Sequence, residues 1–257
     1  MEGKIALCFL TYNNLSKPQL WEKFINTKYN IYIHNKNKFS GVFEKFCIKN
    51  KIETKWGDIS LVKATLNLFK EAFEVKENKY FILLSDKCIP LYNPDELYEK
   101  ITKMNNNIIS CYSPKKNGYF SFPNWNIRQC KYRFNLLNDK SFFDINNFKK
   151  QHQWMILNRE TVDFFLKNNY LDIFGNNFSI IDEHYFINII IKFNISFINK
   201  SITFIDRKNS SNKGYKGSPK IYNTLTNEMI EDILKSDTLF MRKITSECNL
   251  PSYFDKF

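Results

Sequence analysis

Apolar runs alternate with amphipathic segments along the first part of the chain. Ile5 to Leu10 is an uninterrupted apolar run, which predicts a buried strand. Pro18 then opens a segment whose large apolar residues recur at helical spacing as far as Ile25. Tyr29 to His34 predicts a second strand. A strand, a helix and a further strand in this order favour a parallel α/β sheet.

The clearest unit follows. Asp58 or Ser60 can cap a helix whose apolar positions extend to Ala72. Tyr80 to Leu84 is then a strand without polar positions, which predicts burial on both faces. Polar residues come directly after it, at Ser85 to Lys87. Because ligands of open α/β sheets bind at the carboxyl ends of strands, this end is a candidate site.

The remaining pattern predicts alternating short elements. No periodicity is found from Lys115 to Asn147, and no repeat or Pro/Gly/Ser-rich linker divides the chain. The expected elements are a helix at Pro94–Met104, a strand at Asn107–Tyr112, a strand at Trp154–Leu157, a helix at Thr161–Lys167, a helix at Ile181–Ile191, a strand at Ser201–Asp206 and a helix at Asn227–Leu234. We therefore expect one domain, residues 1–257, of the α/β class, with a mostly parallel central sheet flanked by helices.

Charge changes this picture little. The chain has 257 residues and a net charge of +12, from 38 Lys and Arg against 26 Asp and Glu. A basic chain attracts polyanions, so a nucleic-acid-binding protein is one alternative. The lysines are spread along the chain, and no recognition-helix motif accompanies them, so we expect no nucleic acid partner.

Motif searches exclude several classes of protein. There is no Gly-x-Gly-x-x-Gly, P-loop or Gly-x-Ser-x-Gly pattern, which argues against dinucleotide oxidoreductases, P-loop hydrolases and α/β-hydrolases. The six cysteines form no Cys-x-x-Cys pair, and we expect reduced thiols. No apolar stretch reaches the roughly 20 residues of a membrane span, and the first residues do not resemble a signal peptide. The expectation is a soluble, cytoplasmic protein with no transmembrane segment.

The pattern of carboxylates argues against a bound metal. No Asp-x-Asp, Asp-x-Glu or Glu-x-Asp occurs, and the three histidines are far apart in the sequence. An enzyme that releases a diphosphate must still neutralise its charge, and without a metal this requires Arg and Lys. Arg242 and Lys243 are adjacent and could do so, although the pair could equally be an ordinary solvated one.

Three further pairs of neighbouring residues can each be interpreted in two ways. Glu183, beside Asp182 at the start of an apolar helix, could be a general base or could only complement the helix dipole. Gln153 and Trp154 could form a platform for a sugar or belong to the core. Trp56 and Gly57 could let a ligand approach the backbone or could form a simple turn.

Taken in order, these segments resemble a known family, the core-2/I-branching N-acetylglucosaminyltransferases with their xylosyltransferase and plant relatives (glycosyltransferase family 14). The similar blocks are Ile5–Thr11 with Pro18–Phe24, Trp56–Ala64 through Tyr80–Leu91, Gln153–Arg159, Asp182–Phe186 and Phe240–Lys243. They span nearly the whole chain. Residues Arg207–Ser218 and Lys115–Asn147 depart from the family pattern.

The resemblance implies a GT-A-like (Rossmann-like) fold and inverting transfer from a UDP-sugar, most simply UDP-GlcNAc, to a glycan hydroxyl without a metal cofactor. Residues 1–112 would be the nucleotide-sugar-binding half and residues 113–257 the acceptor-side and catalytic half. The implied roles are Glu183 as general base, Arg242 and Lys243 as diphosphate ligands, Thr11 and Asp86 on the nucleotide side, and Gln153, Trp154 and Asp182 on the acceptor side. Xylose, glucuronate or galactose donors remain open, as does a sugar-binding protein without catalysis.

Overall fold

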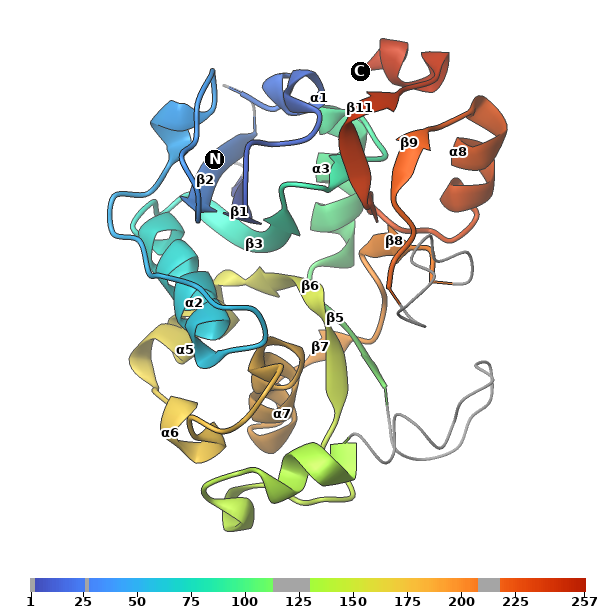
Figure 1. Ribbon diagram of the computed structural model, residues 1–257. Helices are drawn as coiled ribbons and strands as arrows, with labels where there is room; N and C mark the ends of the chain where they lie inside the picture. The colour runs from blue at the N-terminus through green and yellow to red at the C-terminus, as the bar shows by residue number, and fades with distance from the viewer. Residues whose placement is uncertain (1–2, 26–27, 113–129, 208–217) are drawn as a thin grey trace.

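A six-stranded sheet runs through the centre of the protein in the computed structural model, which describes residues 3–25, 28–112, 130–207 and 218–257 (Figure 1). The strand order is β2-β1-β3-β6-β5-β7. The elements are β1 (Lys4–Thr11), α1 (Pro18–Glu22), β2 (Tyr29–Asn35), η1 (Glu44–Phe46), α2 (Ile59–Phe73), β3 (Asn78–Ser85), β4 (Ile89–Pro90), α3 (Pro94–Met104), β5 (Asn107–Tyr112), η2 (Lys140–Phe142), β6 (Lys150–Asn158), α5 (Arg159–Lys167), α6 (Leu171–Phe174), η3 (Ile181–Glu183), α7 (Tyr185–Lys192), β7 (Phe197–Ile198), β8 (Thr203–Ile205), β9 (Tyr222–Thr224), α8 (Asn227–Leu234), β10 (Phe240–Arg242), β11 (Ile244–Asn249) and η4 (Ser252–Lys256).

One strand of the main sheet runs against the others. β1 is parallel to β2 and β3, and β5 is parallel to β7, whereas β6 is antiparallel to both β3 and β5. The first residues of β6 therefore lie at the sheet edge where β1, β3 and β5 end. Strands from both predicted halves share this sheet. The predicted fold class, α/β with a mostly parallel central sheet flanked by helices, is confirmed.

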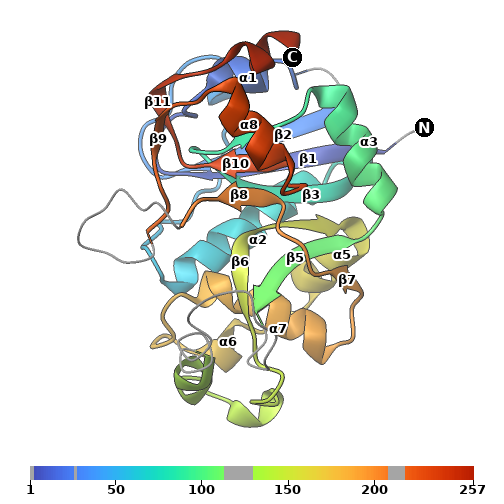
Figure 2. The same cartoon turned by 90° about the vertical axis from the view of Figure 1, so that its right-hand side faces the viewer.

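Helices cover both faces of the sheet. α2 and α5 pack on one face, and the buried side chains of α2 point into the core. Asp58 caps α2, because its carboxylate accepts a hydrogen bond from Ser60 N, which decides between the two predicted caps. α1 and α3 lie on the opposite face (Figures 1 and 2), where Trp21 packs edge-on against Phe9 at a centroid distance of 4.8 Å.

A second, smaller sheet joins β4 to two strands from the C-terminal part of the chain. Its order is β4-β10-β8, with β10 parallel to β8 and antiparallel to β4. Met241 of β10 and Leu20 of α1 belong to one apolar cluster with residues of α8 and η4. Lys17 Nζ donates a 2.7 Å hydrogen bond to Ser246 O, which ties this part to the start of the chain.

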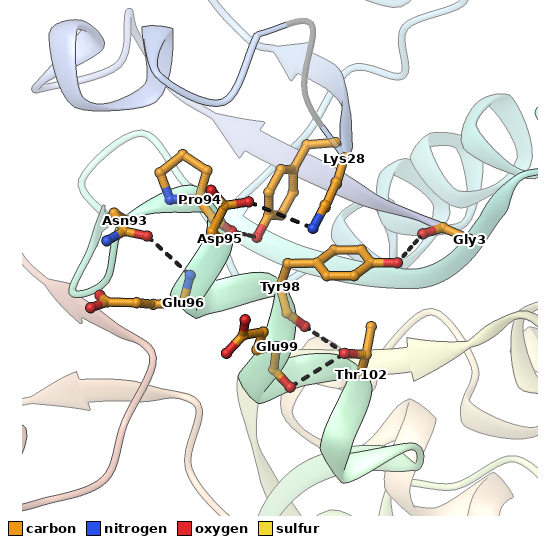
Figure 3. Close-up of polar contacts among 10 residues, drawn as sticks. Gly3, Lys28, Asn93, Pro94, Asp95, Glu96, Tyr98, Glu99 and Thr102 are labelled. Carbon is orange, nitrogen blue, oxygen red and sulfur yellow. Dashed lines mark hydrogen bonds and ion pairs between the residues drawn. The ribbon is translucent and has the colours of Figure 1, made fainter. Parts of the chain in front are cut away.

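The N-terminal ends of β1 and β2 are fastened to α3 by tyrosines (Figure 3). Tyr98 Oη donates to Gly3 O at 2.6 Å, and Tyr29 Oη donates to Pro94 O at 2.8 Å. Lys28 Nζ lies 3.6 Å from Asp95 Oδ1 and 4.7 Å from the centre of the Tyr98 ring. These contacts hold the sheet edge that lies opposite the candidate site.

α3 begins and ends where its sequence predicts. Pro94 occupies the first turn, and Asn93 Oδ1 accepts a 3.0 Å hydrogen bond from Glu96 N (Figure 3). Asn105 ends the helix in the left-handed conformation, with φ of 40°. Proline with an Asn cap at the start and a left-handed residue at the end is a strong local specification.

The predicted helix Ile181–Ile191 is wrong at its start. Ile181–Glu183 is a 3₁₀ turn, and α7 begins only at Tyr185, so Asp182 and Glu183 precede the helix instead of forming its first turn. His184 breaks the helix with φ of −135°, because its ring is buried against Phe148 and its Nδ1 lies 2.8 Å from Lys149 O.

Other boundaries differ by a few residues. α1 and β8 are shorter than predicted, and β6 extends four residues further toward the N-terminus than the apolar run at Trp154–Leu157. Of the segment predicted to be irregular, residues 130–135 are helical and η2 is a short 3₁₀ turn, while residues 115–129 lie outside the described residues. Most of Arg207–Ser218 is also outside them.

Two further observations concern the cysteines and the helices. All six cysteines carry unpaired thiols, and Cys8 and Cys88 are fully buried core residues. Within the described ranges, no helix combines the length and apolar character needed to cross a membrane.

Candidate functional site

Thr11 and Asp86 lie side by side at the carboxyl ends of β1 and β3. The register pairs Leu10 with Ser85, so the two residues follow directly on neighbouring strands. Asp86 Oδ2 accepts a 3.4 Å hydrogen bond from Asn13 N, and burial raises the pKa of its carboxyl group. Thr11 Oγ1 is buried and has no partner among the described residues. The Thr11 hydroxyl and the Asp86 carboxyl group could therefore form further hydrogen bonds with a ligand.

Arg242 and Lys243 reach the same place from the C-terminal part of the chain. β10 pairs with β4, which begins three residues after Asp86, and Ile244 N donates to Lys87 O at 3.1 Å. Burial lowers the pKa of Arg242, and the nearby Cys88 and Asp86 oppose that change. Burial also lowers the pKa of Lys243, and the positive charges of Arg242 and Lys87 lower it further. The predicted basic pair is thus half-buried and adjacent to Asp86.

The structure brings Trp154 to this basic pair. The guanidinium of Arg242 lies 4.5 Å from the centre of the Trp154 ring, and Arg242 Nε has no partner in the described part of the chain. Trp154 as a whole is 5% exposed. Trp154 therefore supports the predicted diphosphate ligand by a cation–π contact, and it presents little surface to an acceptor. Its neighbour Gln153 is half-buried.

A β-bulge shapes this part of β6. Ile109 pairs with Met155 and Cys111 with Gln151, so one residue of β5 faces His152, Gln153 and Trp154. Extra residues of this kind bend a strand and redirect its side chains, and they are frequent beside active sites. Sequence patterns do not reveal a bulge, because the alternation of apolar and polar positions is interrupted there.

Glu183 and Asp182 lie on the 3₁₀ turn η3. Glu183 Oε2 is 2.7 Å from Lys150 Nζ, with 22% of the Glu183 side chain exposed. Asp182 is buried, its Oδ1 has no partner among the described residues, and burial, followed by the charge of Glu183, raises its pKa to about 7. Glu183 is the more accessible of the two carboxylates and therefore the better candidate to meet a substrate hydroxyl.

Tyr112 and His152 form a further polar pair on the neighbouring strands β5 and β6. Tyr112 Oη is 2.6 Å from His152 Nε2. Burial lowers the pKa of His152 to about 4, with further contributions from the positive charges of Arg207, Lys150 and Arg242. Burial raises the pKa of Tyr112, the positive charge of Arg207 opposes this change, and the charge of Glu183 adds to it. The Tyr112–His152 pair is thus within electrostatic reach of both Glu183 and Arg242.

Sequence reasoning missed several of these residues. Lys150, Tyr112 and His152 carry no local motif, and Tyr112 and His152 are 40 positions apart. Arg133 and Arg207 were also not singled out. Arg133 donates to Ser179 O, and burial lowers its pKa against the opposing charges of Glu183 and Asp182. A pairing of β5 with β6 would have shown that Tyr112 is opposite Lys150, and no short-range signal predicts that pairing.

The described residues contain no group of three or more His, Cys, Asp or Glu side chains placed to hold a metal ion. The candidate site instead combines the carboxylates of Asp86, Asp182 and Glu183 with the cations of Lys150, Arg242 and Lys243.

The chain is similar to several known proteins. A rice protein (Oryza sativa subsp. japonica), glycosyltransferase BC10, is 24% identical over 170 residues, which are 62% of this chain and 39% of the rice protein. The chain thus spans less than half of this curated relative. Among solved structures, the apo form of the bifunctional glycosyltransferase WbbM matches 94% of this chain and 46% of its own, with a TM-score of 0.41 and 9% identity. Residues 5–249 match the family described as Core-2/I-Branching enzyme, and the chain belongs to this family of glycosyltransferases.

Proposed function

We propose that the protein transfers a sugar from a UDP-sugar to a hydroxyl group of an acceptor glycan, with inversion at the anomeric carbon and without a metal ion. The observation that carries the proposal is that the hydrogen-bonded Tyr112–His152 pair is within electrostatic reach of both Glu183 and Arg242. A base and a diphosphate-binding group are the two parts that a single displacement requires.

In the proposed reaction, a Glu183 carboxylate oxygen accepts the proton of the acceptor hydroxyl. The hydroxyl oxygen forms a bond to the anomeric carbon, and the bond from that carbon to the diphosphate oxygen breaks. The electron pair leaves with UDP, whose growing negative charge Arg242 and Lys243 neutralise. Arginine keeps its positive charge even when its pKa falls through burial, so it remains suited to this role.

The remaining residues have supporting roles in this proposal. Thr11 and Asp86 line the nucleotide side at the ends of β1 and β3, and Trp154 holds the guanidinium of Arg242. Lys150 positions Glu183 through its ion pair. Asp182 and Gln153 stay candidates for the acceptor side. GlcNAc is the favoured donor sugar through the family resemblance, with xylose, glucuronate and galactose as the alternatives.

The test is UDP release from a panel of UDP-sugars, measured with simple glycosides as acceptors and repeated with EDTA and with added Mn²⁺. We expect one donor to be preferred and the rate to be unchanged by EDTA. Activity that disappears in EDTA and returns with Mn²⁺ would refute the metal-free mechanism. Absence of UDP release from every donor would refute the transferase activity.

A further inference from the structure

A cavity of about 420 Å³ lies between the first turns of α2 and the segment around α6. It is lined by Ile59, Lys63, Asn138, Asn169, Leu171, Asp172, Gly175 and Asn176. Cavities of a few hundred Å³ are of the size that binds small molecules. None of these residues belongs to the candidate active site, so the cavity needs an explanation of its own.

The lining has an apolar part and a polar part. Ile59 and Leu171 supply aliphatic surface, while asparagines, Asp172 and Lys63 supply hydrogen-bonding groups of both kinds. A pyranose ring has the matching character, with C–H groups on its faces and hydroxyl groups around its edge. An anion or a purely apolar ligand would use only one part of this lining.

The backbone around the cavity is fixed in place. Asn138 N donates to Ile173 O at 2.9 Å, and Asn138 Nδ2 donates to Asp172 O at 3.1 Å. Gly175 has φ of +74°, and a Cβ built there would lie 2.3 Å from Asn138 Oδ1. The close approach of Asn138 therefore depends on glycine, and the polar lining is pre-formed.

An exposed tryptophan lies close in sequence to one of the residues that line this cavity. Trp56 is 83% exposed and precedes the lining residue Ile59 by three positions, whereas Trp21 and Trp154 are 0% and 5% exposed. The turn that carries it is held by Ser60 Oγ, which accepts a 3.0 Å hydrogen bond from Lys55 N. A flat, amphipathic indole on a fixed turn is suited to stacking against the C–H face of a sugar.

The same turn contacts the segment that carries the proposed base. Ile180 N donates a 2.6 Å hydrogen bond to Gly57 O, and Gly57 has φ of +70°. Ile180 precedes Glu183 by three residues. A ligand on Trp56 and in the cavity would therefore lie on the part of the molecule that adjoins Glu183.

We propose that Trp56 and this cavity form a distal subsite for an acceptor glycan, which binds a sugar ring other than the one that receives the transferred sugar. This inference rests on the proposed transferase function. It makes a specific claim about substrate: the preferred acceptors are oligosaccharides, and Trp56 contributes to their affinity without contributing to the chemical step.

Binding of chitotetraose, cellotetraose, xylotetraose and maltotetraose, measured by saturation-transfer NMR and titration without donor, tests the subsite. We expect at least one of them to bind, and Trp56→Ala and Asp172→Ala each to weaken its binding at least about tenfold, as expected for an aromatic anchor and its polar partner. Trp56 is largely exposed, so its removal leaves the core intact. Glu99→Ala, in a second cavity on α3, is the matched control and should have no effect.

The outcomes separate this inference from the proposed function. Equal binding by wild type and Trp56→Ala, or no binding of any tetrasaccharide, would refute the subsite. A loss of UDP affinity in Trp56→Ala would also refute it, because the indole would then belong to the donor site. UDP release from the donor in water should be the same in wild type and Trp56→Ala. If the wild type releases no UDP from any donor, the transferase function fails while the binding data still decide the subsite.

Discussion

The two ends of the central strands are built differently. At the N-terminal ends of β1 and β2, the hydroxyl groups of Tyr29 and Tyr98 donate to backbone carbonyls, and none of the residues drawn in Figure 3 has a buried polar side-chain atom without a partner. At the opposite edge, Thr11 Oγ1, Asp182 Oδ1 and Arg242 Nε are buried and lack partners within the described residues. One edge uses its polar groups for stability, while the other leaves buried polar groups without partners, at a cost in stability that fits the proposed ligand site.

If the two edges differ in this way, Glu183→Gln should produce the largest effect on activity and little effect on stability. Loss of the proposed base should reduce turnover about 10²–10⁴-fold. Affinity for UDP should stay unchanged, and so should the free energy of unfolding to within about 1 kcal/mol, because the ion pair with Lys150 is partly exposed. UDP release, calorimetric titration with UDP and urea denaturation measure the three quantities. Glu160→Gln, on the surface of α5, is the control, and near-normal turnover in Glu183→Gln would exclude this residue as the base.

Arg242→Met tests whether the guanidinium, whose Nε has no hydrogen-bond partner among the described residues, serves the ligand more than the fold. We expect the affinity for UDP to fall about 10–100-fold, since a hydrogen bond to a charged group contributes about 1.5–3 kcal/mol. Methionine keeps an apolar contact with Trp154 and removes a buried charge, so the free energy of unfolding should not decrease. Titration with UDP and urea denaturation check both parts, with Lys76→Met as the surface control. A clear loss of stability with unchanged UDP affinity would reverse the comparison.

Asp182→Asn addresses the pH dependence of stability. The pKa of Asp182 is about 7 in the folded protein, above the ordinary value of 3.8. Between about pH 4 and 7 the folded state therefore holds a proton that the unfolded state has released, and the free energy of unfolding falls as pH rises through this window. The variant lacks this loss, so its stability advantage should grow from pH 4 to pH 7 and then level off, on the order of a few kcal/mol.

Urea denaturation of both proteins at several pH values gives this difference directly. His152 and His184, whose pKa values are lowered to about 4 and about 3, have the opposite pH dependence, but both proteins contain them and their contributions cancel. A difference that is independent of pH would mean that Asp182 is ionised in the folded protein at acidic pH.

The smallest effect is expected at the opposite edge. Tyr98→Phe removes the hydrogen bond to Gly3 O and should lower the free energy of unfolding by about 0.5–1.5 kcal/mol. Turnover and UDP affinity should remain at wild-type values, since Tyr98 contacts the end of β1 that is opposite the candidate site. Urea denaturation together with UDP release provides the check. A change in turnover at unchanged stability would show that the two edges are coupled.

Local patterns predicted the elements well where they are self-contained. The apolar runs gave β1, β2 and β3, and Pro94 with Asn93 gave the start of α3. The polar residues after β3 lie at the carboxyl end of that strand, and a ligand site at this end stays a prediction. Arg242 and Lys243 were singled out because they are adjacent in the sequence, although their closeness to Asp86 comes only from the pairing of β10 with β4.

Contacts between distant segments were not predictable in the same way. The reversal of β6, its bulge and the contact of Trp154 with Arg242 depend on strand pairing, for which a single sequence carries no signal. The helix predicted from Ile181 failed for a related reason. The apolar spacing continues through His184, but the buried contacts of its ring with Phe148 and Lys149 override it.

The late position of β10 in the chain has a consequence during synthesis. The strand contributes Arg242, and it docks through the hydrogen bonds from Leu91 N to Leu239 O and from Ile244 N to Lys87 O. A nascent chain that has emerged as far as α7 already contains Glu183 and can pair β1 with β3, yet it still lacks the guanidinium. The Glu183–Lys150 part of the candidate site can thus form on the ribosome before Arg242 and Lys243 exist. Under the proposed function, UDP would favour the completed fold only after residue 243 has emerged.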